Sequence, residues 1–321
     1  MRHNLRIGIV ASLAALAACD QSRSVTAPAS SREAPGDALA SRQGTTSSEM
    51  LITVAATDNV GSDVARMNDD GTNLVMLASG GSVHASPAWA PDGKRIVFAS
   101  DLLGTQSYQA SLFAMNADGT DVTRLTFALA NGTDIDPVGF AAGVVFARGN
   151  GSGVEVSLLD ADGGVTQLTA GPSDAQPAPS PKGKSVAFRR GDEIYVLDLV
   201  THGVTNLTNT PGCDESSPAY SPSGKQIAFE RGTCANVAGG IFVMNDDGTQ
   251  LTRLTTNGVS IDFGPRWSPD GKRIGFTRVS LVTDFTYRSS IYVMNADGTD
   301  VTQLVPPDPT LNDVLSAWAR Y

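Results

Sequence analysis

The sequence predicts an all-β fold, a six-bladed β-propeller of four-stranded antiparallel blades, on three observations. First, a unit of the form Pro-x-x-x-Pro-x-Gly-Lys, followed by an alternating apolar strand, recurs along the chain. Second, a unit of the form Asn-x-Asp-Gly-Thr follows copies of the first. Third, the repeat period is 40 to 51 residues, the length of a blade of four strands. A propeller with another number of blades is the alternative.

The first element is a secretory signal at residues 1–18. Arg2 and Arg6 give a positive charge before an apolar stretch, Ile7–Ala18, that is too short to cross a bilayer as a helix. The stretch ends in Leu-Ala-Ala before Cys19. This ending resembles the bacterial lipobox, which implies cleavage before Cys19 and lipid attachment to it. An ordinary secretion signal followed by a chance cysteine is the alternative.

The lipobox interpretation places the protein in the bacterial cell envelope, facing the periplasm or exposed at the surface. The lipid would be its only attachment to a membrane, and the sequence leaves open whether this is the inner or the outer one. Residues 19–48 are rich in Ser, Ala, Thr, Gln and Pro, so they bury too little apolar surface to fold and form a flexible tether. Residues 49–321 form the propeller.

Each repeat begins with a hairpin whose Pro-x-Gly turn supplies a preset φ and a residue tolerant of positive φ. The strand after the turn alternates apolar and small residues, as β-strands with one buried face do. Four clear copies and one decayed copy, with Ala-Ala-Gly as its turn, are Pro87–Phe98, Pro177–Phe188, Pro218–Phe229, Pro265–Phe276 and Pro137–Phe146.

A second hairpin follows, with Asn-x-Asp-Gly-Thr as its turn. Its copies are Met115–Thr126, Met244–Thr255 and Met294–Leu304, with looser copies at Leu159–Thr169, Leu197–Thr208 and Met67–Leu77. Two hairpins make a four-stranded meander, and six such units make the ring. A calcium loop of the EF-hand type is excluded for these turns, because the twelfth-position carboxylate and the flanking helices are absent.

The two ends of the repeat array complete one blade together. The array opens with Leu51–Ala56, Val64–Met67 and Leu74–Ala78, which correspond to the second, third and fourth strands of a blade. It ends with a lone first strand, Ser316–Tyr321. We therefore expect the C-terminal strand to pair with the N-terminal blade, which closes the ring and removes its exposed edges.

These motifs resemble the TolB-type, WD-repeat-like propeller repeat, and the resemblance covers nearly all of residues 50–321. It implies the propeller fold and makes an envelope protein a plausible partner. The TolB family pairs the propeller with an N-terminal α/β domain and carries no lipid anchor, whereas here a short tether precedes the propeller. A role in the Tol–Pal system does not follow from the resemblance.

The loops predict which face binds. The Pro-x-Gly and Asn-x-Asp-Gly turns share one face, and the longer connections share the opposite one. We call the latter the long-loop face; it carries Leu102–Ala110, Gly232–Gly240 and Val279–Ser290. Binding residues concentrate on variable loops over a rigid scaffold. The contact candidates on this face are Tyr108, Phe285, Tyr287 and Arg288, although solvated loop residues without a role are the alternative.

Two cysteines fall in connections on the long-loop face. Cys213 precedes the first strand of its blade, and Cys234 lies between the second and third strands of the same blade. Export to an oxidising compartment would permit a bridge between them. We expect a disulfide that fastens a surface loop, and two free thiols are the alternative.

An acidic position repeats three residues before the first proline of each unit. Its six occupants, expected to start the innermost strands and to gather at the channel mouth on the long-loop face, are His84, Asp134, Asp174, Glu215, Asp262 and Asp313. One interpretation is that the acids accept hydrogen bonds from backbone amides and tie the blades together. The other is that they bind a cation, for which oxygen ligands favour calcium or magnesium.

The composition excludes some functions and favours binding. Asp and Glu number 33 against 23 Lys and Arg, which argues against a nucleic-acid partner. The sequence contains no Gly-x-Ser-x-Gly nucleophile elbow. We expect a non-catalytic scaffold without a cofactor that binds an envelope protein or an extracytoplasmic ligand. The alternative is a metal-dependent lyase or lactonase acting on sugars through the acidic ring, with His84 as its acid or base.

Overall fold

The computed structural model describes residues 48–56, 61–78, 84–101, 109–129, 132–232, 234, 239–256, 260–283, 286–305 and 311–318. The expected signal, Cys19, nearly all of the tether, Tyr108 and Phe285 lie outside these residues. Ser48, expected as the last residue of the tether, is buried and donates a hydrogen bond to Asp69. No helix among the described residues is long and apolar enough to cross a membrane.

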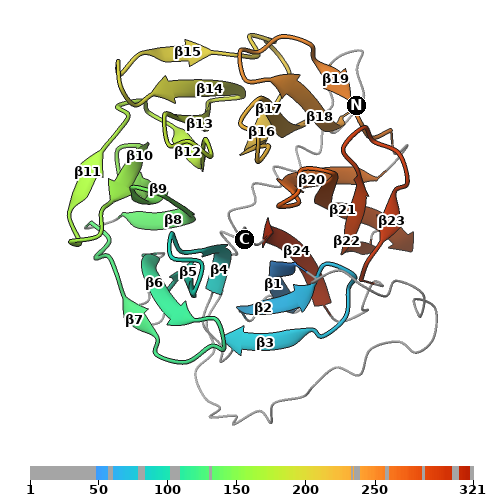
Figure 1. The fold of residues 1–321 in the computed structure, drawn as a ribbon, viewed down its shortest axis with the longest axis horizontal. Coiled ribbons are helices and arrows are strands. Elements are labelled where there is room, and N and C mark those ends of the chain that lie inside the picture. The colour runs from blue at the N-terminus through green and yellow to red at the C-terminus, as the bar shows by residue number, and fades with distance from the viewer. Residues whose placement is uncertain are drawn as a thin grey trace, which may run out of the picture.

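Six antiparallel sheets of four strands form a ring, which confirms the six-bladed propeller (Figure 1). Blade 1 consists of β24 (Leu311–Trp318), β1 (Glu49–Ala56), β2 (Ser62–Asn68) and β3 (Val75–Ala78). Blade 2 consists of β4 (His84–Trp89), β5 (Arg95–Ser100), β6 (Ser111–Asn116) and β7 (Thr123–Arg124). Blade 3 consists of β8 (Thr133–Phe140), β9 (Gly143–Gly149), β10 (Val154–Leu159) and β11 (Val165–Gln167).

The other three blades repeat this order from the channel outward. Blade 4 consists of β12 (Asp174–Pro179), β13 (Ser185–Arg190), β14 (Glu193–Asp198) and β15 (Val204–Asn206). Blade 5 consists of β16 (Glu215–Tyr220), β17 (Gln226–Arg231), β18 (Gly240–Asn245) and β19 (Thr252–Arg253). Blade 6 consists of β20 (Ile261–Trp267), β21 (Arg273–Thr283), β22 (Thr286–Asn295) and β23 (Thr302–Gln303).

The ring closes in blade 1 by pairing of the two ends of the repeat array. Strand β24 pairs antiparallel with β1, so the sheet order is β24-β1-β2-β3, as the repeat arithmetic predicts. The strand begins at Leu311, five residues earlier than expected. Gly275 in blade 6 makes room for it, because a Cβ at Gly275 would lie 2.7 Å from Cδ2 of Leu315.

The two repeated turns have the backbone conformations that their residues predict. The glycines take positive φ, for example +64° at Gly93 and +88° at Gly119. Both turns lie on the face opposite the long loops, which we call the turn face. All five lysines of the chain stand exposed in its Pro-x-Gly-Lys turns; they are Lys94, Lys182, Lys184, Lys225 and Lys272.

The apolar core is divided among the six gaps between neighbouring blades. Each of six clusters takes its buried side chains from two adjacent blades. Phe229 of blade 5, for example, packs with Ala187 and Ile194 of blade 4. Since every blade covers the apolar face of the next, the ring buries its core only when it is closed.

The segment Val279–Ser290, expected as an irregular loop, is a hairpin. Strands β21 and β22 are 11 and 10 residues long and extend beyond the other blades' second and third strands. Leu281 and Tyr287 face each other near its end, and both are exposed. Continued cross-strand pairing gives this part of the long-loop face a defined shape.

Candidate functional site

The repeated acidic position starts the innermost strands, as expected. His84, Asp174 and Glu215 are the first residues of β4, β12 and β16; Asp134 and Asp262 are second in β8 and β20; Asp313 is third in β24. All six side chains are buried, at 3 % relative exposure or less. Their burial already distinguishes them from an open ring of ligands.

Four of the acids are paired with an arginine from the second strand of their own blade. Each arginine contacts a carboxylate that has 0 % side-chain exposure. The four pairs are Asp134–Arg148 at 2.8 Å, Asp174–Arg190 at 2.7 Å, Glu215–Arg231 at 2.5 Å and Asp262–Arg278 at 2.7 Å. The guanidinium groups also lie over a phenylalanine of the same strand, as Arg148 does over Phe146 at 5.1 Å.

This pairing corrects two expectations about the acidic position. The main partner of the acids is a guanidinium group, whereas backbone amides contribute only in part, as Gly171 does to Asp174. The pairs lie within one blade, so these ion pairs do not tie neighbouring blades together. Among the described residues, no group of three or more His, Cys, Asp or Glu side chains is arranged to hold a metal ion.

Two blades depart from the acid–arginine pattern. In blade 2 the Nδ1 atom of His84 lies 2.8 Å from the Ser100 hydroxyl, and burial lowers the pKa of His84 although Asp101 opposes the shift. In blade 1 Asp313 is paired in register with Val54. The alignment of second strands contains the signal for these pairs. A Phe-x-Arg sequence lies in the second strand wherever the inner strand carries the paired acid, and Phe-Ala-Ser takes its place opposite His84.

The channel between the innermost strands is an open cavity of about 740 Å³. All six innermost strands line it, and most of its surface is apolar. It reaches the turn face at Pro91, Pro222 and Pro269, and the long-loop face at Tyr287 and Asn312. Such a volume suits a small ligand or an inserted peptide segment.

A belt of polar side chains surrounds part of this channel, two residues after the acidic position. Its members, all with φ between 50° and 54°, are Ser86, Asp136, Gln176 and Ser217. The Ser86 hydroxyl donates to Asp136 Oδ1 at 3.1 Å, and the Ser217 N–H donates to Gln176 Oε1 at 2.9 Å. The Gln176 N–H donates to the Asp136 carboxylate. The belt therefore links blades 2 to 5.

Blade 6 has Gly264 at the belt position, and its strand instead contributes Arg266 to the channel wall. Arg266 donates from Nε to the Ser316 carbonyl at 2.6 Å and from Nη1 to the Pro265 carbonyl at 2.8 Å. Innermost strands contact their neighbours in the order β4, β8, β12, β16, β20, β24. Strand β20, which carries Arg266, therefore lies across the channel from β8, which carries Asp136 (Figure 1). Sequence comparison of the copies missed both, since each charge occurs in one blade only.

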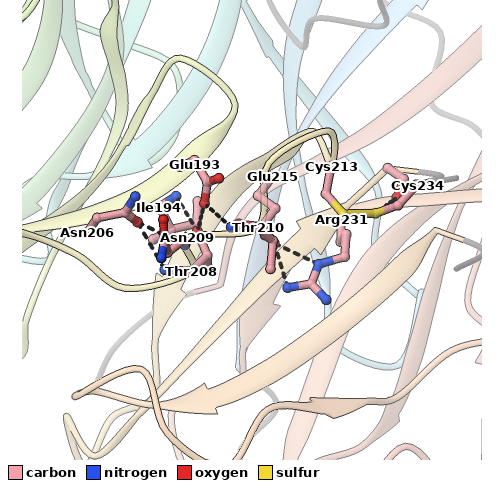
Figure 2. Close-up of polar contacts among 11 residues, drawn as sticks. Glu193, Ile194, Asn206, Thr208, Asn209, Thr210, Cys213, Glu215, Arg231 and Cys234 are labelled. Atoms are coloured by element: carbon pink, nitrogen blue, oxygen red, sulfur yellow. Dashed lines mark hydrogen bonds and ion pairs between the residues drawn. A yellow bond between two sulfur atoms is a disulfide. The ribbon is translucent and has the colours of Figure 1, made fainter.

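The long-loop face contains the expected disulfide, between Cys213 and Cys234, with Cα atoms 4.8 Å apart (Figure 2). Next to it, the Thr210 hydroxyl donates to Glu215 Oε1 at 2.7 Å, and the Thr210 N–H donates to Glu193 of blade 4 at 3.0 Å. The connection between blades 4 and 5 is thus fastened at both ends. Of the expected loop contacts, Tyr287 is 44 % exposed, and both it and Arg288 line the channel mouth.

Comparisons with known proteins agree with this geometry. Residues 186–312 match the family model of the TolB β-propeller domain. The structure of TolB from Acinetobacter baumannii is similar, at 20% identity and a TM-score of 0.70, over 85% of this chain and 67% of that one. A putative TolB from Agrobacterium tumefaciens is similar at 19% identity and a TM-score of 0.64, over 85% of this chain and 94% of that one.

The fold also occurs in hydrazine synthase of Kuenenia stuttgartiensis, at 16% identity and a TM-score of 0.70, over 86% of this chain and 47% of that one. Identities this low concern the fold alone. Among curated protein sequences there is no match to this chain. The six blades and the similar TolB structures agree on the fold: the chain is a six-bladed β-propeller similar to that of TolB, and its residues 186–312 match the TolB β-propeller domain.

Proposed function

We propose that this protein is a non-catalytic binding scaffold of the bacterial cell envelope, tethered through a lipid on Cys19, which binds a protein or ligand at the channel mouth on its long-loop face. The observation that carries the proposal is the cavity of about 740 Å³, which is open at this mouth and mostly apolar. A rigid ring with an open, apolar centre presents a preformed surface, so binding of a partner carries no cost for ordering that surface.

The channel mouth supports this proposal by its construction. The β21–β22 hairpin borders the mouth with Tyr287 and Arg288, and the Ser289 N–H donates to Asn312 Oδ1 of the closing strand at 3.2 Å. Exposed aromatic and arginine side chains are the types that contribute most to protein interfaces. The sugar lyase or lactonase considered above gains no comparable observation, because arginines hold four of the acids that it would use.

Site-specific photo-crosslinking in the producing cells tests the scaffold. A photoreactive phenylalanine replaces Tyr287 or Asn312 at the mouth, and in control variants it replaces Val165 or Val204 on the exposed outer strands. We expect discrete adducts from the mouth positions and none from the outer strands. Equal labelling from both sets would contradict the proposal, and the absence of adducts from the mouth would contradict a protein partner there.

The lipid anchor is tested separately. We expect metabolic labelling with a clickable fatty acid to mark the wild-type protein and not the Cys19→Ala variant. Labelled protein should remain with membranes after a high-salt wash, since acyl chains bind by apolar burial and not by charge. Unlabelled wild-type protein in the soluble extracytoplasmic fraction would contradict the anchor.

A further inference from the structure

Two opposite charges stand on opposite walls of the channel without forming an ion pair with each other. Asp136 projects from β8 and Arg266 from β20, and each influences the pKa of the other through space. Their side chains both line the cavity and are only half-buried, so a ligand inside the cavity can reach them. The inference that follows rests on the proposed function, in that it takes the channel to be a binding site.

Hydrogen bonds hold the Asp136 carboxylate in place, but nearby positive charge does not compensate for its burial. The Ser86 hydroxyl and the Gln176 N–H fix its carboxylate. Burial raises the pKa of Asp136, and neither these donors nor Arg266 offsets that effect. A carboxylate that is partly removed from water gains stability when a cation comes into contact with it.

Arg266 is the complementary case on the facing wall. Its Nε and Nη1 atoms bond backbone carbonyls, and its Nη2 atom makes no hydrogen bond within the described part of the chain. Burial lowers the pKa of Arg266 against the opposing effect of Asp136. The guanidinium plane is thus fixed by the protein, and one edge remains to receive an anion.

The wall nearer the turn face is aromatic. Three positions beyond the polar belt, Trp89, Tyr220 and Trp267 line the cavity. Trp267 is fixed by a hydrogen bond from its Nε1 atom to the Ala219 carbonyl at 3.2 Å. An apolar group in the channel would therefore lie against rings next to the charged level.

We propose that the channel binds a zwitterionic ligand of the amino-acid type, with its ammonium group on Asp136, its carboxylate on Arg266 and an apolar side chain against the aromatic wall. One such ligand neutralises both charges at once, whereas a simple cation or anion leaves the opposite charge uncompensated. The class covers free amino acids and the ends of short peptides, which share this chemistry.

The test is calorimetric titration of the purified full chain with four probes. They are phenylalanine, 2-phenylethylamine, 3-phenylpropionate and the neutral N-acetylphenylalanine amide, which share a phenyl ring and differ in charge. We expect phenylalanine to bind at least tenfold more tightly than either singly charged probe, with the neutral amide weakest. Equal affinity for phenylalanine and the amide would overturn the proposal, as would the absence of phenylalanine binding.

Variants assign each charge to its residue. We expect Asp136→Asn to weaken the binding of phenylalanine and 2-phenylethylamine about tenfold and to leave the affinity for 3-phenylpropionate unchanged. Arg266→Gln should weaken the binding of phenylalanine and 3-phenylpropionate about tenfold and leave the affinity for 2-phenylethylamine unchanged. Arg266→Lys should retain most of the affinity. Asp92→Asn, at the turn end of the same cavity, is the matched control that removes one carboxylate and should change nothing. Loss of all probes in both charge variants, each with a wild-type melting curve, would overturn the assignment.

The titration and the crosslinking experiment test the zwitterion site and the protein partner separately. Crosslinks from Tyr287 without phenylalanine binding would refute the zwitterion site alone. Phenylalanine binding without crosslinks would refute the protein partner alone. Should Asp136→Asn not fold, the Arg266 variants and the four probes still decide the question.

Discussion

Arg148 and Asp134 form a two-point ion pair inside blade 3, with Nε to Oδ1 and Nη2 to Oδ2 both at 2.8 Å. The carboxylate is fully buried and the guanidinium side chain is 11 % exposed. Removing one partner leaves the other charge buried without compensation, which costs about 3–5 kcal/mol. We therefore expect Arg148→Met to lower the free energy of unfolding by about that amount in urea titrations.

The control for this variant is the exposed pair of Arg95 and Asp92, whose side chains are 48 % and 47 % exposed. Arg95→Met should cost less than about 1 kcal/mol. Adding Asp134→Leu to Arg148→Met should restore part of the loss, since an apolar pair avoids the cost of desolvating charge. Additive losses in the double variant would show that the two side chains act independently.

Blade 2 offers a gain-of-interaction experiment. His84 and Ser100 occupy the positions that hold the acid and the arginine in four other blades. Ser100→Arg alone should destabilise the protein by about 3 kcal/mol, because it buries an unpaired charge. His84→Asp added to it should recover at least half of that loss. A double-mutant cycle by urea unfolding gives the coupling energy, and a value near zero would contradict the equivalence of the blades.

The closing strand depends on Trp318, which is 6 % exposed and donates from Nε1 to the Ser48 hydroxyl at 2.6 Å. Trp318→Ala should cost about 3–5 kcal/mol and increase aggregation, since the opened edges of blade 1 can pair with another copy. Phe127, which is 74 % exposed, provides the matched control. Its alanine variant should melt like the wild type and elute as the same species in size-exclusion chromatography.

The disulfide encloses a loop with a sequence separation of 21 residues. Cys213→Ser with Cys234→Ser should lower the free energy of unfolding by about 3 kcal/mol, because the unfolded chain gains conformational freedom. A reductant should shift the melting temperature of the wild type and leave the double variant unchanged. Mass spectrometry without reduction should find no alkylatable thiol at these two positions in the wild type.

Glu230 on β17 confers a pH dependence on stability. Burial, with smaller contributions from Asp214 and Asp262, raises the pKa of Glu230 to about 7, against a hydrogen bond from Ser216 and the charge of Arg189. The folded protein therefore holds this proton where the unfolded chain has lost it. Stability is complete below the unfolded pKa and falls as pH rises to about 7.

Water reaches part of the Glu230 side chain, so we expect a loss of about 1–2 kcal/mol across this range. Glu230→Gln should remove that part of the pH dependence and make the protein more stable than the wild type at pH 8. Melting scans from pH 4 to 8 measure both. Parallel pH profiles for the two proteins would contradict the role of Glu230.

The fold could be predicted from the sequence because the motifs that specify a blade occur several times along the chain. Turn residues recur in most blades, and the unequal ends of the array require β24 to join blade 1. The repeat alignment places the acidic position on the innermost strands but does not reveal its surroundings. The partners come from another strand of the same blade, where the Phe-x-Arg sequence supplies a buried arginine. Comparison of the copies gives weight to what they share, so the single charges Asp136 and Arg266 went unnoticed.

The lysines of the turn face have a practical consequence. Amine-reactive reagents would modify the propeller only in its four Pro-x-Gly-Lys turns, at Lys94, Lys182, Lys184, Lys225 and Lys272. Protein coupled to a biosensor chip through these side chains would therefore be immobilised in one orientation, with the hairpin and the disulfide directed into the flowing sample. Random attachment blocks a fraction of binding sites on most proteins, and here the chain's own composition prevents it.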